Sequence, residues 1–322
     1  MGKTPVGFAT HPACLAHVAG PAHPERPARL EAILARLDGE GLRKRMVELV
    51  PRPATEADLA LCHTTAHIAR VREACAGSLP LAPDTGTSPA SWEAALRAAG
   101  AGLVAAEAIA AGKVTRAFCA VRPPGHHAGP SSAGGFCLFN NLAIAARHLQ
   151  RRLGIKRVAI VDFDCHHGNG TQEIFRADGG VLACSIHQFG PNPLNPAVPF
   201  YPGSGAADET GEGAGAGRIV NAPVPSGAGL AEFEEAILER FTPVIESFDP
   251  GIILVAAGFD GHRDDPLALL ELSTEDYGLI TRQIVGIADR VCQGRVLSML
   301  EGGYHLSALA ASAAAHVTAL LE

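Results

Sequence analysis

The sequence predicts an α/β fold in which a buried parallel sheet is covered by helices on both faces. Short, continuously apolar segments alternate along the chain with longer segments of helical pattern, which is typical of this class. Hydrophobic residues make up 47% and charged residues 18% of the 322 residues, so the chain can form a large core. Because no internal repeat and no long linker interrupts the chain, we expect residues 1–322 to form a single domain.

The predicted strands are short apolar runs that stand between the helical patterns. In chain order they are 116–121, 157–162, 180–187, 251–256 and 295–300. The predicted helices are the longer segments of helical pattern, at 24–37, 89–112, 141–153, 230–247, 274–290 and 306–321. The Gly- and Pro-rich stretch 190–229 is expected to be a long surface loop. Its GEGAGAG run follows no clear strand, which argues against a phosphate or dinucleotide loop.

Charge and cysteine content exclude several function classes. The chain has 26 basic and 33 acidic residues, a net charge of −7, which opposes binding to nucleic acid and to anionic membranes. The eight cysteines form no CxxC pair, and the N-terminal residues lack the apolar core of a signal peptide. The longest apolar run, 251–259, is too short to span a bilayer. We therefore expect a reduced, cytoplasmic protein without a nucleic-acid or membrane partner.

Four of the predicted strands are followed directly by residues that can carry chemistry. These sequences are RPPGHH at 122–127, FDCHHGN at 163–169, AGFD at 257–260 and EGGY at 301–304. Ligands of open parallel sheets bind beyond the carboxyl ends of the strands. We therefore expect the four segments to meet in one crevice.

The pattern Asp162-x-Asp164-x-His166 points to a metal site. In an extended segment, alternation places all three side chains on one side of the chain. Asp260 follows another core strand and is the obvious further ligand. Two carboxylates, an imidazole and an open position suit catalytic zinc, and the oxygen content leaves Fe²⁺ or another divalent ion open. The alternative is a polar turn after a strand.

His126 and His127 are candidates for a general acid and a general base beside the metal. The alternative is a turn after Pro-Pro-Gly, where polar residues are common. Each imidazole would need a partner on its other nitrogen, and Asp162 and Asn169 are the nearest unassigned candidates. A carboxylate favours the imidazolium, whereas an amide leaves its imidazole closer to neutral. Such an asymmetry would divide the acid and base roles between the rings.

Tyr304 ends the EGGY segment, where its hydroxyl could donate a hydrogen bond to an oxyanion above the metal. The alternative is a turn that ends the strand, with Gly302 and Gly303 relaxing the backbone. Further along the predicted sheet, His187 follows an apolar run and is expected to reach the floor of the site. Ser185 is a candidate for a secondary cation site with Asp162 and Asp164.

Six sequence blocks, in this order, resemble the histone deacetylase family, in particular its class II-type and bacterial branch. They are HPERPARL, RPPGHHA, GFCLFNN, VDFDCHHGNG, AAGFDGHRDDPL and LEGGYHL, and they cover nearly the whole chain. The resemblance implies a single arginase/deacetylase domain with an eight-stranded parallel sheet. It implies zinc held by Asp164, His166 and Asp260, with His127 as the base, Asp162 and Asn169 orienting the tandem histidines His126 and His127, and Tyr304 at the oxyanion.

The same resemblance implies a narrow acyl-lysine channel. Phe136, with Gly135 before it, would line one wall, and Phe200 or Tyr201 from the 190–203 loop the opposite wall. Asp84 would lie at the rim and hold the substrate backbone. Family members also bind potassium, which would fall near Asp162, Asp164, His166, Ser185 and Ile186.

The activity implied is hydrolysis of acetyl-lysine, in a protein, a peptide or a small acylated amine, to acetate and a free amine by metal-activated water. The first alternative is deacetylation of acetylpolyamines, whose family members resemble one another in an acidic gatekeeper shortly after the third metal ligand. Here Leu267 occupies that position, which favours a neutral acyl-amine, but Asp264 and Asp265 nearby keep the question open.

Two further alternatives are weaker. A protein that binds acyl-lysine without turnover would have lost a ligand or the tyrosine, and neither is missing. A ureohydrolase would need a second set of Asp ligands, which we do not find. Substrate identity and acyl length stay open. So does the oligomeric state, because the 190–229 loop could pack against a neighbouring subunit or fold over the site.

Overall fold

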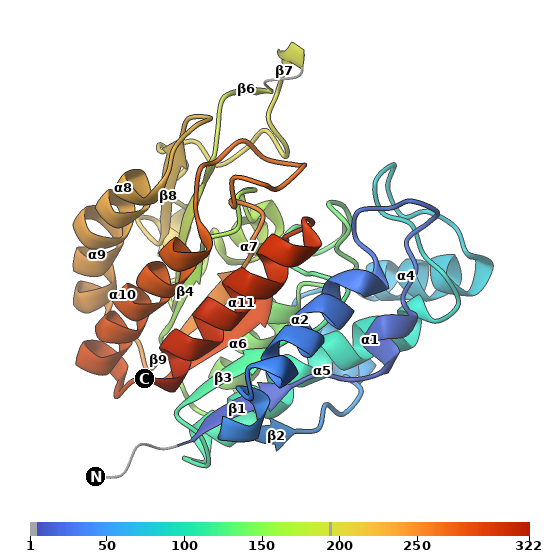
Figure 1. The fold of residues 1–322 in the computed structure, drawn as a ribbon, viewed down its shortest axis with the longest axis horizontal. Coiled ribbons are helices and arrows are strands. Elements are labelled where there is room, and N and C mark those ends of the chain that lie inside the picture. The colour runs from blue at the N-terminus through green and yellow to red at the C-terminus, as the bar shows by residue number, and fades with distance from the viewer. Residues whose placement is uncertain (1–4, 193–194) are drawn as a thin grey trace.

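All five predicted strands lie in one central sheet of the computed structural model, which describes residues 5–192 and 195–322 (Figure 1). They are β3 (Arg116–Cys119), β4 (Val158–Asp162), β5 (Val181–Gln188), β9 (Ile252–Ala257) and β10 (Val296–Leu300). The sheet has eight strands in the order β2-β1-β3-β10-β9-β4-β5-β8, and every neighbouring pair is parallel. Since strands from the whole length of the chain share this sheet, the protein is a single α/β domain, as predicted.

In the central sheet, the sequence pattern missed β1 (Val6–Ala9), β2 (Met46–Leu49) and β8 (Ile219–Val224). β2 and β8 form the two edges of the sheet, where part of each strand faces solvent and the apolar run is weaker. β8 corrects the expectation that 190–229 is one irregular loop. The same stretch also contains a small antiparallel pair, β6 (Pro191–Asn192) with β7 (Asn195–Pro199), which projects from the domain (Figure 1).

Each predicted helix is present, with ends that shift by a few residues. The matching helices are α2 (Pro27–Gly39), α5 (Ser91–Ala110), α6 (Asn141–Arg152), α10 (Thr274–Cys292) and α11 (Leu306–Leu321). The predicted helix at 230–247 consists of α8 (Leu230–Glu235), a π-helical turn (Ala236–Phe241) and α9 (Thr242–Phe248). The sequence pattern missed α4 (Thr65–Gly77), α7 (Asn169–Phe175), the one-turn helices α1 (Ala13–Ala16) and α3 (Glu56–Leu59), and the 3₁₀ turns Arg43–Arg45 and Gly213–Gly215.

Helices cover both faces of the sheet. On one face α2, α11 and α10 pack side by side, and Figure 1 shows them across the near side. On the other face α5 and α6 pack against each other and against the central strands. All eight cysteines are free thiols. Within residues 5–192 and 195–322, no helix is both long and apolar enough to cross a membrane.

The central strands β3, β10, β9 and β4 are neighbours in the sheet. Because they are parallel and in register, their carboxyl ends meet at one edge, with Asp162 paired to Ala256 and Leu300 to Ala257. The four segments that follow these strands therefore converge, as the sequence predicted. This edge of the sheet carries the candidate site.

Candidate active site

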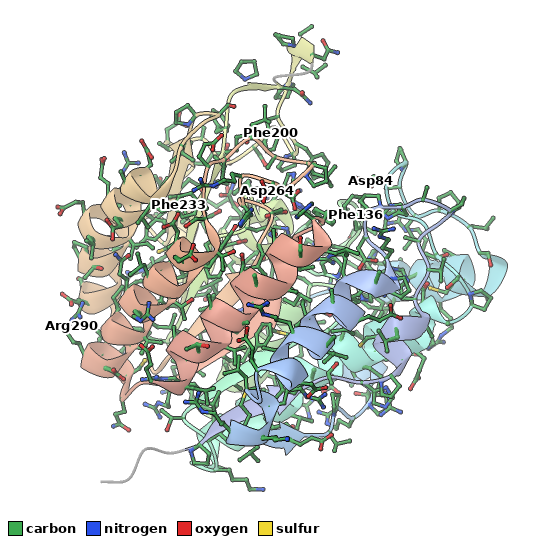
Figure 2. The ribbon with its side chains drawn as sticks, in the orientation of Figure 1. Asp84, Phe136, Phe200, Phe233, Asp264 and Arg290 are labelled. Carbon is green, nitrogen blue, oxygen red and sulfur yellow. The ribbon has the colours of Figure 1, made fainter. Side chains whose placement is uncertain are left out.

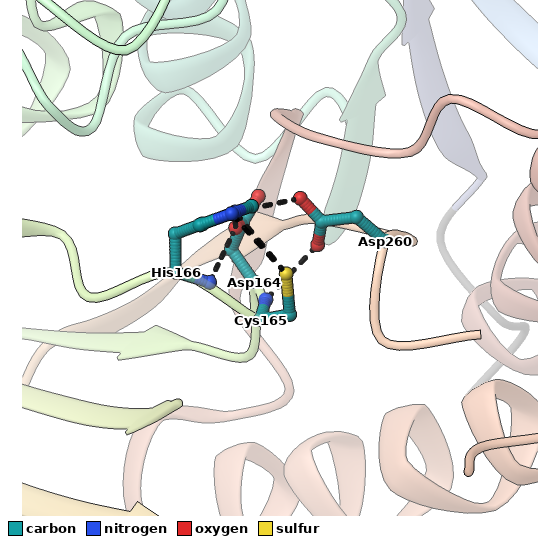
Figure 3. Close-up of side chains that lie close together, drawn as sticks. All are labelled: Asp164, Cys165, His166 and Asp260. Carbon is teal, nitrogen blue, oxygen red and sulfur yellow. Dashed lines mark hydrogen bonds and ion pairs between the residues drawn. The ribbon is translucent and has the colours of Figure 1, made fainter. Parts of the chain in front are cut away.

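Asp164, His166 and Asp260 form a buried cluster beyond the ends of β4 and β9 (Figure 3). Nδ1 of His166 lies 3.2 Å from Oδ1 of Asp164 and 3.1 Å from Oδ2 of Asp260. The candidate ligand atoms, together with the sulfur of Cys165, all lie within 4.8 Å of one another. The two sequence segments that supply them thus converge on a volume that one ion could occupy.

The structure corrects the expectation of an extended 162–166 segment. β4 ends at Asp162, and the chain then turns, with the Asp164 amide donating to Oδ1 of Asp162 over 3.1 Å. The His166 amide donates to Oδ1 of Asp164 in the same way over 2.9 Å. These side-chain acceptors stabilise turns rather than strand. Asp162 consequently faces His126 instead of joining the ligand cluster.

Two glycines leave room for the carboxylates. A Cβ on Gly258 would lie 2.0 Å from Oδ2 of Asp164, and one on Gly302 would lie 2.0 Å from Oδ2 of Asp260. The Gly302 amide also donates to Oδ2 of Asp164 over 2.8 Å. Any larger residue at either position would displace a carboxylate, so both glycines preserve the shape of the cluster.

The residues of the cluster fit a divalent cation. Burial alone would lower the pKa of His166, but its hydrogen bonds to Asp164 and Asp260 outweigh burial and raise it to about 10. The cluster therefore holds more negative charge than its own groups neutralise, which a divalent ion would balance. Two carboxylate oxygens and one imidazole nitrogen match the ligand preferences of zinc, and also those of Fe²⁺.

The thiol of Cys165 lies beside the cluster, and the sequence pattern did not single it out. Its sulfur lies 3.1 Å from Nδ1 of His166. Burial, followed by the charges of Asp260 and Asp164, raises the pKa of the thiol well above its ordinary value. Since the thiolate and not the thiol is the metal ligand, Asp164, His166 and Asp260 remain the candidate set.

The tandem histidines lie side by side next to the cluster, with ring centroids 4.0 Å apart. Nδ1 of His126 lies 3.0 Å from Oδ2 of Asp162, and Nδ1 of His127 lies 2.8 Å from Oδ1 of Asn169. The structure therefore brings one carboxylate and one amide to the two rings, the pair of partners that the sequence suggested.

The two rings have opposite protonation preferences. For His126, burial alone would lower the pKa, but the charges of Asp164 and Asp162 outweigh burial and raise it well above the ordinary value. For His127, burial lowers the pKa well below the ordinary value, and the positive charges of His126 and His166 add to that effect. This environment favours an imidazolium at His126 and a neutral imidazole at His127.

A cavity of about 240 Å³ leads to the cluster. The Phe200 ring stacks on His166 at 5.2 Å between centroids, and the Phe136 ring meets Tyr304 edge to face at 5.6 Å. Figure 2 shows Phe136 and Asp84 close together and Phe200 on a separate segment above them. Of the residues that the structure describes, ten line the cavity: Asp84, His127, Gly135, Phe136, His166, Asn192, Phe200, Tyr201, Leu267 and Tyr304.

All the predicted channel residues line this cavity, and so do both candidates for the opposite wall, Phe200 and Tyr201. Tyr201 meets the His127 ring edge to face at 5.0 Å. Asp84 uses Oδ2 to accept the Gly135 amide over 3.0 Å, so it holds the loop that presents Phe136. Its predicted contact with substrate stays a prediction.

The predicted potassium residues gather where β4 and β5 run side by side. Asp162 pairs with Ser185 in register, and Ser185 and Ile186 are buried. Binding of potassium there stays a prediction. His187, which was expected at the floor of the site, is not among the described cavity residues. Its Nδ1 lies 2.9 Å from Oγ of Ser185 and its Nε2 lies 3.0 Å from the Gly205 carbonyl, so a place at the floor of the site stays a prediction.

Of the charged residues behind the site, the sequence suggested only Glu25, as a residue that could shape the site wall, and missed Arg29 and Arg122. The Arg29 side chain is fully buried and donates to the carbonyls of Gly303 and Glu301 over 2.5 and 2.6 Å. Its guanidinium also lies 4.8 Å from the Tyr304 ring centroid. Glu25 bonds both Arg29 and the buried Arg122. The i, i+4 spacing of Glu25 and Arg29 in the HPERPARL block was the available signal.

Comparison with known proteins finds one matching domain family and several similar proteins over most of the chain. Residues 23–320 match the histone deacetylase domain family. The chain is 38% identical to a probable deacetylase of Archaeoglobus fulgidus, covering 92% of this chain and 81% of that protein. It is 35% identical to a histone deacetylase-like amidohydrolase of Pseudomonas aeruginosa (90% and 79%) and 39% identical to the polyamine deacetylase HDAC10 of Homo sapiens (92% and 44%). The crystal structure of the HDA15 HD domain is similar with a TM-score of 0.92 and 38% identity, covering 99% of this chain and 88% of that one.

Proposed function

This chain belongs to the histone deacetylase family, and we propose that it is a zinc-dependent deacylase that hydrolyses the amide of an acetylated lysine. The substrate can be a protein, a peptide or a small acylated amine. The observation that carries the proposal is the buried Asp164–His166–Asp260 cluster at the base of an aromatic cavity, with two differently partnered histidines beside it. This combination supplies a metal site, a base, an acid and a substrate channel in one place.

Zinc fits the three candidate ligands, and when bound it supplies a Lewis acid that polarises the acetamide carbonyl and makes water more acidic. The protein residues handle the protons. Because the amide oxygen of Asn169 only accepts, Nδ1 of His127 carries a proton and donates it to that oxygen. Nε2 of His127 is left with a lone pair, which takes a proton from water as the water oxygen attacks the carbonyl carbon.

His126 is the proposed acid. Its Nδ1 is bonded to the Asp162 carboxylate, which favours the imidazolium form. A proton from this imidazolium reaches the amine nitrogen as the carbon–nitrogen bond breaks, so that acetate and free amine leave. Tyr304, whose side chain lines the cavity, donates its hydroxyl hydrogen bond to the carbonyl oxygen as negative charge develops.

The cavity supports an extended, apolar substrate arm. Phe136 and Phe200 provide aromatic surface along it, and Leu267 is the residue at the proposed gatekeeper position. Such a lining suits the methylene chain of an acyl-lysine, because burial of apolar surface is favourable and the aromatic faces exclude water. A charged amine in the middle of the substrate would gain little there.

Neither aspartate before Leu267 offers a countercharge to a polyamine. The Asp264 side chain is 58% exposed and lies 3.7 Å from Nδ1 of His262. The Asp265 carboxylate is directed to backbone amides. Among the described residues that line the cavity, Asp84 is the one carboxylate outside the metal cluster. These contacts favour acyl-lysine over acetylpolyamine, the alternative that the HDAC10 relative represents.

Acetate release by purified, zinc-loaded protein tests the proposal. We expect chelator-sensitive release from an acetyl-lysine peptide, and slower release from acetylputrescine at the same concentration. Faster turnover of acetylputrescine would contradict the substrate assignment. Release from neither, with zinc bound at one equivalent, would contradict the deacetylation proposal itself.

Replacing Leu267 with glutamate should move the preference toward acetylputrescine. A carboxylate at this position gives the substrate ammonium a charged hydrogen-bond partner, worth about 1.5–3 kcal/mol, so the ratio of kcat/KM values should shift by about tenfold or more. The matched control is Asp264→Asn, which removes an exposed charge outside the cavity and should leave the ratio unchanged. An unchanged ratio in L267E would mean that Leu267 does not face the substrate.

A further inference from the structure

We propose that Asp265 is a positioning residue that ties the gatekeeper Leu267 to the oxyanion tyrosine Tyr304, so that one carboxylate sets both the channel wall and the catalytic hydroxyl. The proposal rests on the deacetylation function proposed above. Asp265 itself is not among the described residues that line the cavity, so its action is through these two neighbours.

The contacts of Asp265 divide between two segments far apart in the sequence. Its Oδ2 accepts the backbone amides of Tyr304 over 2.7 Å and of His305 over 3.3 Å. Its Oδ1 accepts the amide of Leu267 over 3.0 Å. The side chain therefore bridges the Leu267 loop (residues 261–272) and the Tyr304 loop (residues 301–305).

A carboxylate in this position is costly, which supports a specific role. Asp265 is only 6% exposed, and within residues 5–192 and 195–322 it accepts hydrogen bonds from backbone amides but forms no ion pair with a cationic side chain. Burial, followed by the nearby charge of Asp260, raises the pKa of its carboxyl group. Three directed amide hydrogen bonds offset part of that penalty. A side chain needed only to fill space would be apolar here.

The Tyr304 loop is held from two sides. On one side Arg29 donates hydrogen bonds to the carbonyls of Glu301 and Gly303. On the other side Asp265 accepts hydrogen bonds from the amides of Tyr304 and His305. The Arg29 contacts fix the loop to the body of the domain. The Asp265 contacts fix it relative to Leu267, which lines the cavity. Loss of Asp265 would therefore leave the Tyr304 loop anchored to the domain by Arg29, but the position of Tyr304 relative to Leu267 would no longer be fixed.

Asp265→Asn tests this arrangement with almost no change in volume. An amide has one accepting oxygen and one donating NH₂ group, so either Leu267 or the Tyr304–His305 pair must face a donor instead of an acceptor. We expect kcat for an acetyl-lysine peptide to fall by up to about 100-fold, since small displacements of a catalytic group have effects of that size. Asp264→Asn, which removes the neighbouring exposed carboxylate, is the matched control and should retain wild-type kcat.

A trifluoroacetyl-lysine peptide separates positioning of Tyr304 from general damage. The fluorines stabilise negative charge on the carbonyl oxygen, so this substrate depends less on the tyrosine hydrogen bond. If Asp265 acts through Tyr304, D265N should lose much less activity on the trifluoroacetyl peptide than on the acetyl peptide. An equal loss on both, or no loss on either, would overturn the proposal.

Amide hydrogen exchange tests the geometry without relying on activity. The amides of Tyr304 and His305 should be protected in the wild type and in D264N, and should exchange faster in D265N. Unprotected amides in the wild type would overturn the proposal even if D265N failed to fold. Protected amides in a wild type that releases no acetate would instead retain the Asp265 contacts and reject the deacetylation function, so the two failures are distinguishable.

Discussion

Tyr304→Phe is expected to lower kcat for acetyl-lysine hydrolysis by about 10²–10³-fold, the usual effect of removing one donor to a developing oxyanion. The ring of Tyr304 contacts Phe136 edge to face and lies against the Arg29 guanidinium, and phenylalanine can keep both contacts. The hydroxyl group is the one element that is lost. Stability and bound zinc should therefore stay at wild-type levels while turnover falls.

Measuring kcat together with zinc content tests whether the Tyr304 hydroxyl takes part in turnover. Steady-state rates on an acetyl-lysine peptide would be measured beside metal analysis and thermal unfolding of the same samples. Retained turnover in Y304F would remove this hydroxyl from the mechanism. A fall in turnover together with zinc loss would show damage to the cluster, which the structure gives no reason to expect because Tyr304 makes none of its ligand contacts.

The fold was predictable for most strands that are buried along their whole length, although β1, which is also buried throughout, was missed. β4, β5, β9 and β10 are continuously buried, so their apolar runs stand out in the sequence. β2, in which only the last residue is buried, gives no such run. β8 was missed for a related reason, since its alternating burial lies within a Gly- and Pro-rich stretch that otherwise indicates a loop.

The site residues that directly follow strands could be predicted from the sequence. The residues that reach the site through long-range packing could not. His126, Asp164, Asp260 and Tyr304 each follow a predicted strand, and parallel topology alone brings strand ends together. Arg29 meets Tyr304 from a helix at the far end of the sequence. No local pattern fixes such a contact.

Asp265 illustrates the same limit, because the sequence left two acidic neighbours beside the gatekeeper position. Their roles differ only in direction, Asp264 facing solvent and Asp265 facing the amides of the Tyr304 loop. Adjacent residues in a loop carry no periodicity that could separate these directions. Only the three-dimensional contacts do so.

Asp260→Asn should abolish zinc binding and lower kcat/KM by about 10³-fold or more, because a metal Lewis acid supplies several kcal/mol of transition-state stabilisation. The substitution separates the loss of charge from the loss of a structural hydrogen bond. Oδ1 of Asp260 accepts a hydrogen bond from the Cys165 amide over 2.9 Å, and the asparagine oxygen can keep this bond. What is lost is the negative charge of the oxygen that faces His166. The folded backbone should therefore survive while the ligand set does not.

Thermal unfolding with and without zinc gives the decisive measurement for Asp260. A ligand that binds only the folded state stabilises it, so zinc should raise the Tm of the wild type and of the control D264N, and chelation should reverse the rise. In D260N the Tm should be insensitive to both zinc and chelator. Without metal, D260N should be at least as stable as the wild type, since it carries one less buried negative charge beside Asp164. A zinc-dependent Tm in D260N would mean that Asp260 is not a ligand, and that the ion is held by Asp164 and His166 with some other group.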